Sequence, residues 1–217
     1  MVAVYDLDEE RSLIAMELCE GGTLRDRLRR GPLSPSDALR RATELATTLC
    51  AVHAAGIVHR DLKPGNLLLR SLAAGAASLA VEGQDLVLGD FGLALLDERR
   101  GDGDGDAVRA GGTLSYMAPE QQRGVATSAS DVFALGVLLR ELLCGPASRE
   151  AKGAVPLLVA AAHEATLPTA LAPLLGAARA PVEELLGALL DPDPGSRPTA
   201  RDLIPLLDDL RHRLPTP

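Results

Sequence analysis

Apolar and polar positions alternate in short blocks at the start of the chain. The runs VAVYD (2–6) and LIAMEL (13–18) flank the polar turn LDEERS, and this pattern predicts a β-hairpin. The segment LSPSDALRRATELATTLCAVHAAG (33–56) carries apolar residues at helical spacing and predicts a long helix. Ser34 can cap the start of this helix, and Gly56 can end it in the left-handed conformation.

Helical patterns dominate the second half of the chain. The segment SASDVFALGVLLRELLCGP (128–146) is apolar on nearly all sides, which predicts a helix buried in the middle of the domain. Two more helices are predicted in 181–194 and 199–214, whereas 66–69 and 85–92 are strand-like. There is no internal repeat and no linker, so we predict one α+β domain with a mainly helical body and short β-hairpins.

Composition and charge narrow the class of protein. Apolar residues make up 47% of the 217 residues but aromatic residues only 2%, so the core must be built from Leu, Val and Ala. The net charge of −8 argues against a nucleic-acid binder. No apolar run reaches the length of a membrane span, and the start is no signal peptide. The three cysteines lie far apart without a CxxC motif, and we expect reduced thiols in a cytoplasmic protein: Cys19, Cys50 and Cys144.

Three motifs occur in a fixed order along the chain. They are HRDLKPGN (59–66), DFG (90–92) and GTLSYMAPE (112–120). They resemble the catalytic loop, the magnesium loop and the end of the activation segment of protein kinases, and the spacing from Asp61 to Asn66 fits the family pattern. The resemblance covers nearly the whole chain and is to bacterial-type serine/threonine protein kinases. It implies a protein-kinase-like fold, ATP and Mg²⁺ as cofactors, and protein substrates with Ser or Thr hydroxyl groups.

The resemblance also implies roles for individual residues. Asp61 would accept or orient the proton of the substrate hydroxyl, because phosphoryl transfer depends on positioning and charge neutralisation. Asn66 and Asp90 are hard oxygen ligands that would hold magnesium. Lys63 would lie beside the γ-phosphate, as in serine/threonine kinases. Thr113 resembles the threonine that bonds the catalytic aspartate and lysine.

The segment LIAMELCEGGTL (13–24) resembles the hinge that binds adenine. Met16 would be the gatekeeper, and the backbones of Glu17 and Cys19 would bond the base. Leu24 and Leu68 would pack under the adenine ring. Packing in the protein core is the alternative role for these side chains.

Other residues resemble the family's scaffold. Glu120 and Arg197 resemble a buried ion pair that ties the activation segment to the helical lobe, and breaking such a pair costs about 3–5 kcal/mol. Asp131 would bond backbone near the catalytic loop, while His59 and Phe91 would stack in a hydrophobic column. The residues with a structural role by this resemblance are His59, Arg60, Phe91, Gly92, Glu120, Asp131 and Arg197.

The activation segment departs from the family pattern. Arg60 beside the catalytic aspartate is typical of kinases with a positive pocket for an activation-loop phosphate. Between Gly92 and Thr113, however, there is no Ser, Thr or Tyr. One hypothesis is that an aspartate of DGDGD (102–106) supplies the negative charge. The alternatives are that Arg60 is only partly paired, or that the loop has no regulatory meaning.

Three parts of the kinase pattern would precede Met1: the Gly-rich loop, the lysine on a strand and the helix with its glutamate partner. We therefore expect a single kinase-like domain over 1–217, in which 1–18 is a remnant of the small-lobe strands and hinge start and 19–217 is the large C-terminal lobe. This chain alone should bind ATP weakly. It should also expose apolar surface that the missing small lobe or a partner covers.

Three explanations stay open for this pattern: a misplaced start, a gene fragment, or a non-catalytic, pseudokinase-like binding scaffold. The retained polar residues of the catalytic loop favour the enzyme, whereas the absent lysine and glycine loop favour the scaffold. Binding of Mg-ATP would distinguish the two, because a ligand stabilises a protein only when it has real affinity for the folded state.

Overall fold

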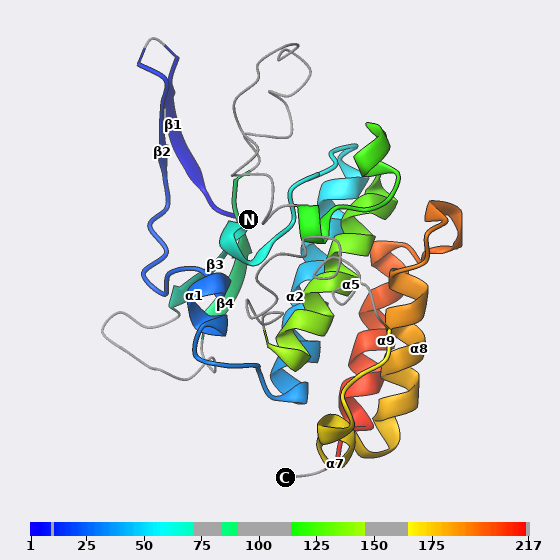
Figure 1. The fold of residues 1–217 in the computed structure, drawn as a ribbon. Coiled ribbons are helices and arrows are strands. Elements are labelled where there is room, and N and C mark those ends of the chain that lie inside the picture. The colour runs from blue at the N-terminus through cyan, green and yellow to red at the C-terminus, as the bar shows by residue number, and fades with distance from the viewer. Residues whose placement is uncertain (10, 72–83, 91–113, 146–164, 216–217) are drawn as a thin grey trace, which may run out of the picture.

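Two small strand pairs lie beside a helical body in the computed structural model, which describes residues 1–9, 11–71, 84–90, 114–145 and 165–215 (Figure 1). β1 (Val4–Asp8) pairs antiparallel with β2 (Leu13–Met16), as the alternating pattern predicted. β3 (Leu67–Ser71) pairs antiparallel with β4 (Gln84–Leu88). The tip between β3 and β4 lies outside the described residues.

The helices form most of the described structure, in agreement with the predicted α+β class. The helices are α1 (Leu24–Leu28), α2 (Pro35–Ala54), α5 (Ser128–Cys144), α7 (Ala172–Leu175), α8 (Arg179–Leu189) and α9 (Ala200–His212). Short 3-10 turns connect them: η1 (Pro64–Asn66), η3 (Leu114–Tyr116), η4 (Gln121–Arg123), η5 (Thr169–Leu171), η6 (Gly176–Ala178) and η7 (Pro194–Ser196). No helix in these described stretches is both long and apolar enough to span a membrane.

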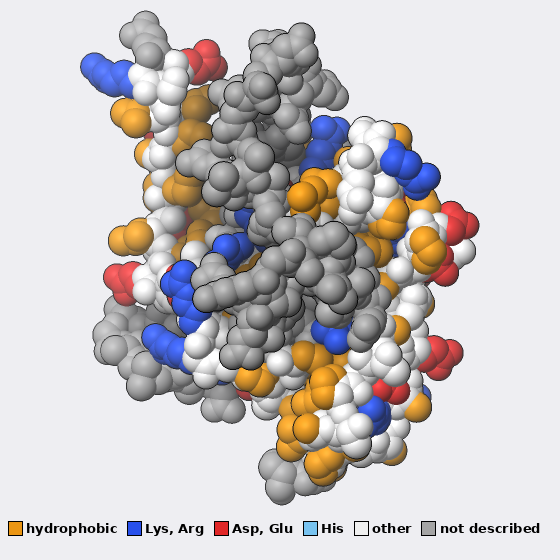
Figure 2. Space-filling model, viewed as in Figure 1, with side chains coloured by type: hydrophobic (Ala, Val, Ile, Leu, Met, Phe, Trp, Pro, Cys, Tyr) orange, Lys and Arg blue, Asp and Glu red, His pale blue; other side chains and the backbone are white. Residues whose placement is uncertain are grey.

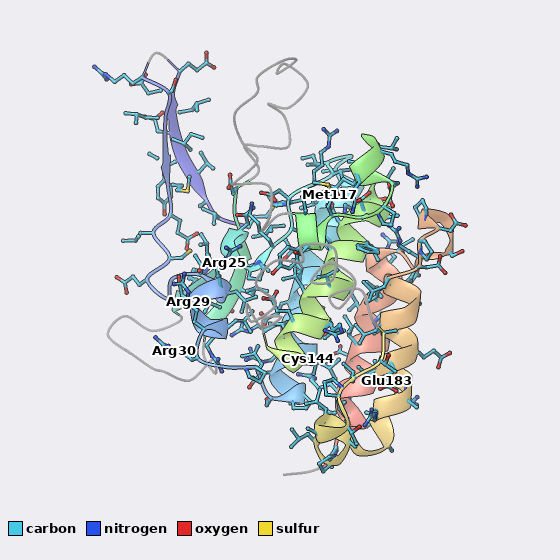
Figure 3. All side chains as sticks on the ribbon, viewed as in Figure 1. Arg25, Arg29, Arg30, Met117, Cys144 and Glu183 are labelled. Atoms are coloured by element: carbon cyan, nitrogen blue, oxygen red, sulfur yellow. The ribbon has the colours of Figure 1, made fainter. Side chains whose placement is uncertain are left out.

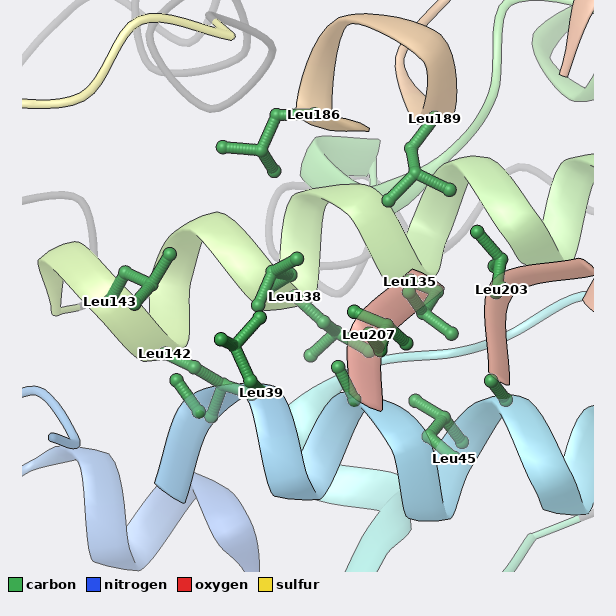
Figure 4. Packing of buried hydrophobic residues seen from close by; sticks show 14 of the residues in the cluster. Leu39, Leu45, Leu135, Leu138, Leu142, Leu143, Leu186, Leu189, Leu203 and Leu207 are labelled. Atoms are coloured by element: carbon green, nitrogen blue, oxygen red, sulfur yellow. The ribbon is translucent and has the colours of Figure 1, made fainter. Parts of the chain in front are cut away.

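A leucine-rich core holds the helical body together. α2 packs against α9 and α5, and α5 in turn packs against α8, so α5 lies in the middle as predicted (Figure 4). Gly136 allows the α5–α8 approach, because a Cβ atom there would lie only 2.7 Å from the Cβ of Leu189. The dense packing of leucines makes this body the rigid base of the molecule.

The helix ends follow the capping residues in the sequence. Ser34 caps α2, and its Oγ accepts a hydrogen bond from the Asp37 N–H at 3.1 Å. Thr199 caps α9 in a reciprocal capping box with Asp202. Gly56 follows α2 with a φ of 74°, which is the left-handed conformation that favours glycine.

The β1–β2 hairpin differs from this body, because nearly all its side chains are exposed and it extends away from the helices (Figure 1). Its base is attached to the other strand pair by backbone hydrogen bonds. The Val2 N–H donates to Leu88 O at 3.0 Å, and the Gly21 N–H donates to Leu69 O at 2.9 Å. A Cβ atom on Gly21 would lie 2.3 Å from Leu69 O, so only glycine permits this approach.

Candidate active site

The charged loop (residues 59–66) runs from the end of α2 to the start of β3. Arg60 in this loop has a φ of 70°, a left-handed conformation that costs a non-glycine residue about 1–3 kcal/mol. Two side chains hold it there: the Arg60 N–H donates to Asp131 Oδ1 at 2.9 Å, and Gln121 Nε2 donates to Arg60 O. Tertiary contacts therefore fix the backbone immediately before Asp61.

Asp131 of α5 anchors the charged loop through its backbone. Its side chain is 1% exposed, and its two oxygens accept the N–H groups of His59 and Arg60, each at 2.9 Å. His53, near the end of α2, adds a third contact, with Nε2 at 2.8 Å from Asp131 Oδ2. Since both oxygens have partners, this buried carboxylate is fully satisfied and serves the scaffold.

Asp61, Lys63 and Asn66 meet within the charged loop. Lys63 Nζ lies 2.5 Å from Asp61 Oδ2. Asn66 Nδ2 donates to Asp61 Oδ2 at 3.0 Å and to the Asp61 carbonyl at 2.8 Å. The other oxygen, Asp61 Oδ1, is buried and has no hydrogen-bond partner in the described part of the chain. A buried acceptor without a partner is costly, so this oxygen marks a position where a ligand group can bind.

Gly89 and Asp90, at the end of β4, lie against the charged loop. The Gly89 N–H donates to Asn66 O at 2.9 Å, and His59 Nε2 lies 3.1 Å from Gly89 O. Asp90 is exposed and has a φ of 59°, again a left-handed conformation in a residue other than glycine. These bonds hold Gly89, the residue before Asp90, against Asn66, although Asp90 and Asn66 are 24 positions apart in the chain.

Asn66 and Asp90 fit a magnesium ion rather than a metal held by protein ligands alone. Asn66 Nδ2 is occupied by Asp61, which leaves its amide oxygen as an available donor to a metal. Magnesium typically keeps several waters and takes one or two carboxylates together with substrate phosphates. Within the described ranges no group of three or more His, Cys, Asp or Glu residues could hold a metal ion.

Glu120 and Arg197 form a buried ion pair at the N-terminal end of α5. The two arginine NH groups donate to the two carboxylate oxygens at 2.7 and 2.9 Å, and Ser130 Oγ donates to Glu120 Oε1 at 2.7 Å. The arginine also lies 4.9 Å from the centre of the Phe133 ring. Burial opposes ionisation of Glu120, but the hydrogen bonds from Arg197 and Ser130 outweigh it and lower the pKa of this carboxyl group.

Tyr116, Glu141 and Arg25 form a second polar cluster nearby. The Tyr116 hydroxyl donates to Glu141 Oε2 at 2.5 Å, and burial raises the pKa of both groups. The positive charge of Arg25 opposes both shifts. We did not predict this cluster, although a glutamate inside an otherwise apolar helix was a usable signal, because buried charges need a partner.

Most of the predicted hinge residues lie at the base of the β1–β2 hairpin. The Met16 side chain is 48% exposed, and Cys19 is buried. The Glu17 side chain binds Arg70 at 3.1 Å. Leu68 Cδ1 lies 3.4 Å from the Cβ position that a side chain at Gly89 would have, so Leu68 faces the end of β4.

Leu24 lies in the core of the helical body. It was predicted to pack under an adenine ring, with core packing as the alternative role, and its 0% exposure favours the alternative. As the first residue of α1 it points inward, because the apolar side of this short helix must be buried. It therefore has no surface that a ligand could contact, and its role is packing.

Several predicted residues cannot be placed in the structure. Thr113, Phe91 and Gly92 lie outside the described residues, and so does the DGDGD segment (102–106) that we considered as a charge substitute near Arg60. Gln121 was not predicted as a site residue, although its side chain donates a hydrogen bond to the Arg60 carbonyl. No sequence signal identifies that contact, since it depends on how η4 packs against the loop.

Comparison with known proteins agrees with this arrangement. The protein kinase domain family matches residues 1–205. The serine/threonine-protein kinase PknL of Mycobacterium tuberculosis is 40% identical over 152 residues, which cover 67% of this chain and 34% of the relative. The serine/threonine-protein kinase PrkC of Bacillus subtilis is 35% identical over 159 residues, which cover 71% of this chain and 22% of the relative.

A third relative, the serine/threonine-protein kinase PkaA of Streptomyces coelicolor, is 40% identical over 152 residues, which cover 67% of this chain and 26% of the relative. The matched part thus spans 22–34% of the length of these three relatives. The family match, in contrast, takes in nearly the whole chain and all three motifs of the sequence analysis. The chain belongs to the protein kinase domain family, as the kinase-like motifs predicted.

Proposed function

We propose that this chain provides the larger part of a serine/threonine protein kinase, which transfers a phosphoryl group from ATP to Ser or Thr hydroxyl groups of a protein. The observation that carries the proposal is Asp61. Its Oδ2 is held by Lys63 and Asn66, while its Oδ1 has no hydrogen-bond partner in the described residues. The relatives PknL, PrkC and PkaA, which are named serine/threonine-protein kinases, support the same reaction.

The charged loop can orient a substrate hydroxyl. Asp61 Oδ1 accepts the hydroxyl hydrogen bond, and the proton moves to this carboxylate as the oxygen attacks. Lys63 stabilises the ionised carboxylate and places a positive charge beside the transferred phosphoryl group. The bond from Asn66 restricts rotation of Asp61, so that its free oxygen keeps one direction.

Asn66 and Asp90 would hold the magnesium ion. When bound, the ion neutralises the charge of the ATP phosphates. The hydrogen bond from the Gly89 N–H to Asn66 O supports this pairing, because it holds the residue before Asp90 against Asn66. For adenine we propose Met16 as gatekeeper, with the Glu17 carbonyl and the Cys19 N–H as bonding groups and Leu68 as an apolar contact. Among the described residues, neither of those two backbone groups has another hydrogen-bond partner.

We also propose that the β1–β2 hairpin is covered by further protein in the working enzyme. Residues 1–18 would then be small-lobe strands and 19–217 the large lobe. An isolated two-stranded hairpin is marginal in water, yet this one exposes large apolar side chains on both faces, Tyr5 and Ile14 among them. Additional small-lobe strands would bury these side chains and complete the nucleotide site.

The test is phosphate transfer from labelled ATP by the full-length protein, with Mg²⁺, to a Ser/Thr protein substrate. Asp61→Asn should lower the rate about 100-fold or more, because positioned proton transfer contributes about 10²–10⁴-fold. Asp209→Asn, on the exposed side of α9, is the matched control and should leave the rate unchanged. If the wild type transfers no phosphate and Mg-ATP does not raise its melting temperature, the non-catalytic scaffold becomes the better assignment.

A further inference from the structure

The short helix α1 and the residues after it are strongly basic. Residues 24–30, LRDRLRR, contain four arginines and one aspartate, a net charge of 4 − 1 = +3 in a chain whose net charge is −8. Figure 2 shows Lys and Arg side chains gathered where Figure 1 places α1. We call the exposed members Arg25, Arg29 and Arg30 the α1 arginine ridge, and Figure 3 shows them along one side of the molecule.

Arg25 joins this ridge to the charged loop. Its Nε and one terminal nitrogen lie 3.5 and 3.6 Å from the Cβ position that a side chain at Gly65 would have. Gly65 belongs to η1, between Lys63 and Asn66, and α1 packs against this turn. The guanidinium group therefore lies over the backbone of the proposed phosphoryl-transfer loop.

The charges of the ridge are only partly compensated. Arg29 pairs with Asp26 at 2.7 Å, and Arg27 donates to Gly31 O at 3.1 Å. Within the described residues, Arg25 and Arg30 have no carboxylate at ion-pair distance. The Arg25 charge also acts on the half-buried carboxyl group of Glu141, but this group already accepts a hydrogen bond from the Tyr116 hydroxyl at 2.5 Å.

We propose that Arg25 and Arg30 determine substrate specificity by binding anionic side chains of the protein substrate, on the α1 side of the accepting hydroxyl. This inference rests on the proposed kinase function and names its substrate class as acidic peptides. An extended peptide rises about 3.3 Å per residue, so Arg25 reads a side chain within a few residues of the hydroxyl and Arg30 one farther along. The arginine fork binds carboxylate and phosphate alike, so both acidic and previously phosphorylated residues fit.

The experiment compares three peptides of one sequence around a single Ser. One carries Asp and Glu at the flanking positions, one carries phosphoserine there, and one carries the neutral Asn and Gln. The full-length wild type should show kcat/KM about two- to thirtyfold higher for both anionic peptides than for the neutral one, since two exposed arginine–anion pairs each contribute modestly. Higher salt should reduce the difference.

The charge-reversal variant Arg25→Glu/Arg30→Glu should lose this preference, so that its ratio of kcat/KM on the anionic peptides to kcat/KM on the neutral peptide falls to about one or below. Arg201→Glu/Arg213→Glu is the matched control, because both arginines are exposed in or directly after α9 and their reversal makes the same change in charge outside the ridge. Arg25→Lys/Arg30→Lys should keep part of the preference for carboxylates and less for phosphate, because lysine lacks the fork. A preference for only one of the two anionic peptides would also support the proposal. It would show whether the ridge binds carboxylate or phosphate groups.

Two results separate failure of this inference from failure of the proposed function. Equal rates on all three peptides would overturn the specificity proposal and leave the kinase assignment intact. If no peptide is phosphorylated, binding of the fluorescently labelled peptides, followed by anisotropy, still decides. Acidic-peptide binding that disappears in Arg25→Glu/Arg30→Glu but not in Arg201→Glu/Arg213→Glu supports the ridge. Equal binding by the double variant, or equally tight binding of a single-stranded RNA of the same charge, overturns it.

Discussion

Asp131 accepts hydrogen bonds from the backbone directly before Asp61, yet the two carboxylates differ in burial and in hydrogen bonding. The Asp131 side chain is 1% exposed, and both of its oxygens accept hydrogen bonds. The Asp61 side chain is 12% exposed, and one of its oxygens has no partner in the described residues. Both oxygens of Asp131 are therefore bonded within the fold, whereas Asp61 keeps one oxygen that can accept a hydrogen bond from a substrate.

Glu120 belongs with Asp131 in this comparison. Its carboxylate is buried, and both oxygens bind Arg197. Charge within the core is therefore not a sign of catalysis by itself, because a fully bonded group stabilises structure. The distinguishing sign is an incomplete set of hydrogen bonds at a partly accessible position, and Asp61 has it.

The largest expected effect comes from breaking the satisfied ion pair. Arg197→Met should lower the free energy of unfolding by about 3–5 kcal/mol, because Glu120 would remain buried without its partner. Urea denaturation followed by circular dichroism measures this loss. Adding Glu120→Gln to the same chain should recover most of it. A loss below about 1 kcal/mol would mean that the pair is not buried as described.

The same chemical change at the two aspartates should give unequal losses of stability. Asp131→Asn turns an accepting oxygen into a donor facing a backbone N–H, and should cost about 1–3 kcal/mol of stability. It should also speed amide hydrogen exchange at His59 and Arg60. Asp61→Asn should change the free energy of unfolding by less than about 1 kcal/mol, because its pair with Lys63 is partly exposed. Equal losses in the two variants would contradict the comparison.

The smallest expected effect is a change with pH. The pKa of Glu120 is lowered in the folded state from an ordinary value of 4.5, so folding is favoured by its ionised form. This contribution is fully present above pH 4.5 and is lost as the pH falls through the lower folded pKa. Denaturation curves between neutral pH and pH 3 should therefore lose less stability in Glu120→Gln than in wild type. If the free energy of unfolding falls equally with pH in wild type and Glu120→Gln, the lowered pKa of Glu120 is contradicted.

Local patterns were sufficient to predict most of the fold. Helical spacing and end caps predicted α2 and α9, the nearly continuous apolar run predicted α5, and alternating runs predicted the hairpins. Each of these patterns depends only on residues within one element. The described part of 165–180, which contains α7, was not predicted, since its Ala-, Leu- and Pro-rich sequence has no clear period. The sequence left two roles open for Leu24, and only the packing of α1 against the core favours one of them.

The site was predicted as residue types but not as contacts. The motif placed Asp61, Lys63 and Asn66 within six positions, so their meeting follows from short-range geometry. Three other contacts join segments far apart in the chain: His53 with Asp131, Gln121 with Arg60, and Arg25 with Gly65. Such contacts depend on how the helices pack, and a periodic pattern carries no information about the partner.

The attachment of the β1–β2 hairpin gives the molecule a path for mechanical load. Val2 is bonded to Leu88 and Gly21 to Leu69, so both legs of the hairpin are fastened to the β3–β4 pair. At one end of this pair, Asn66 directly precedes β3, and Gly89 and Asp90 directly follow β4. A pull or tilt applied to the exposed hairpin would thus act as a lever on the two proposed magnesium-binding residues, with no intervening side chain needed to relay it.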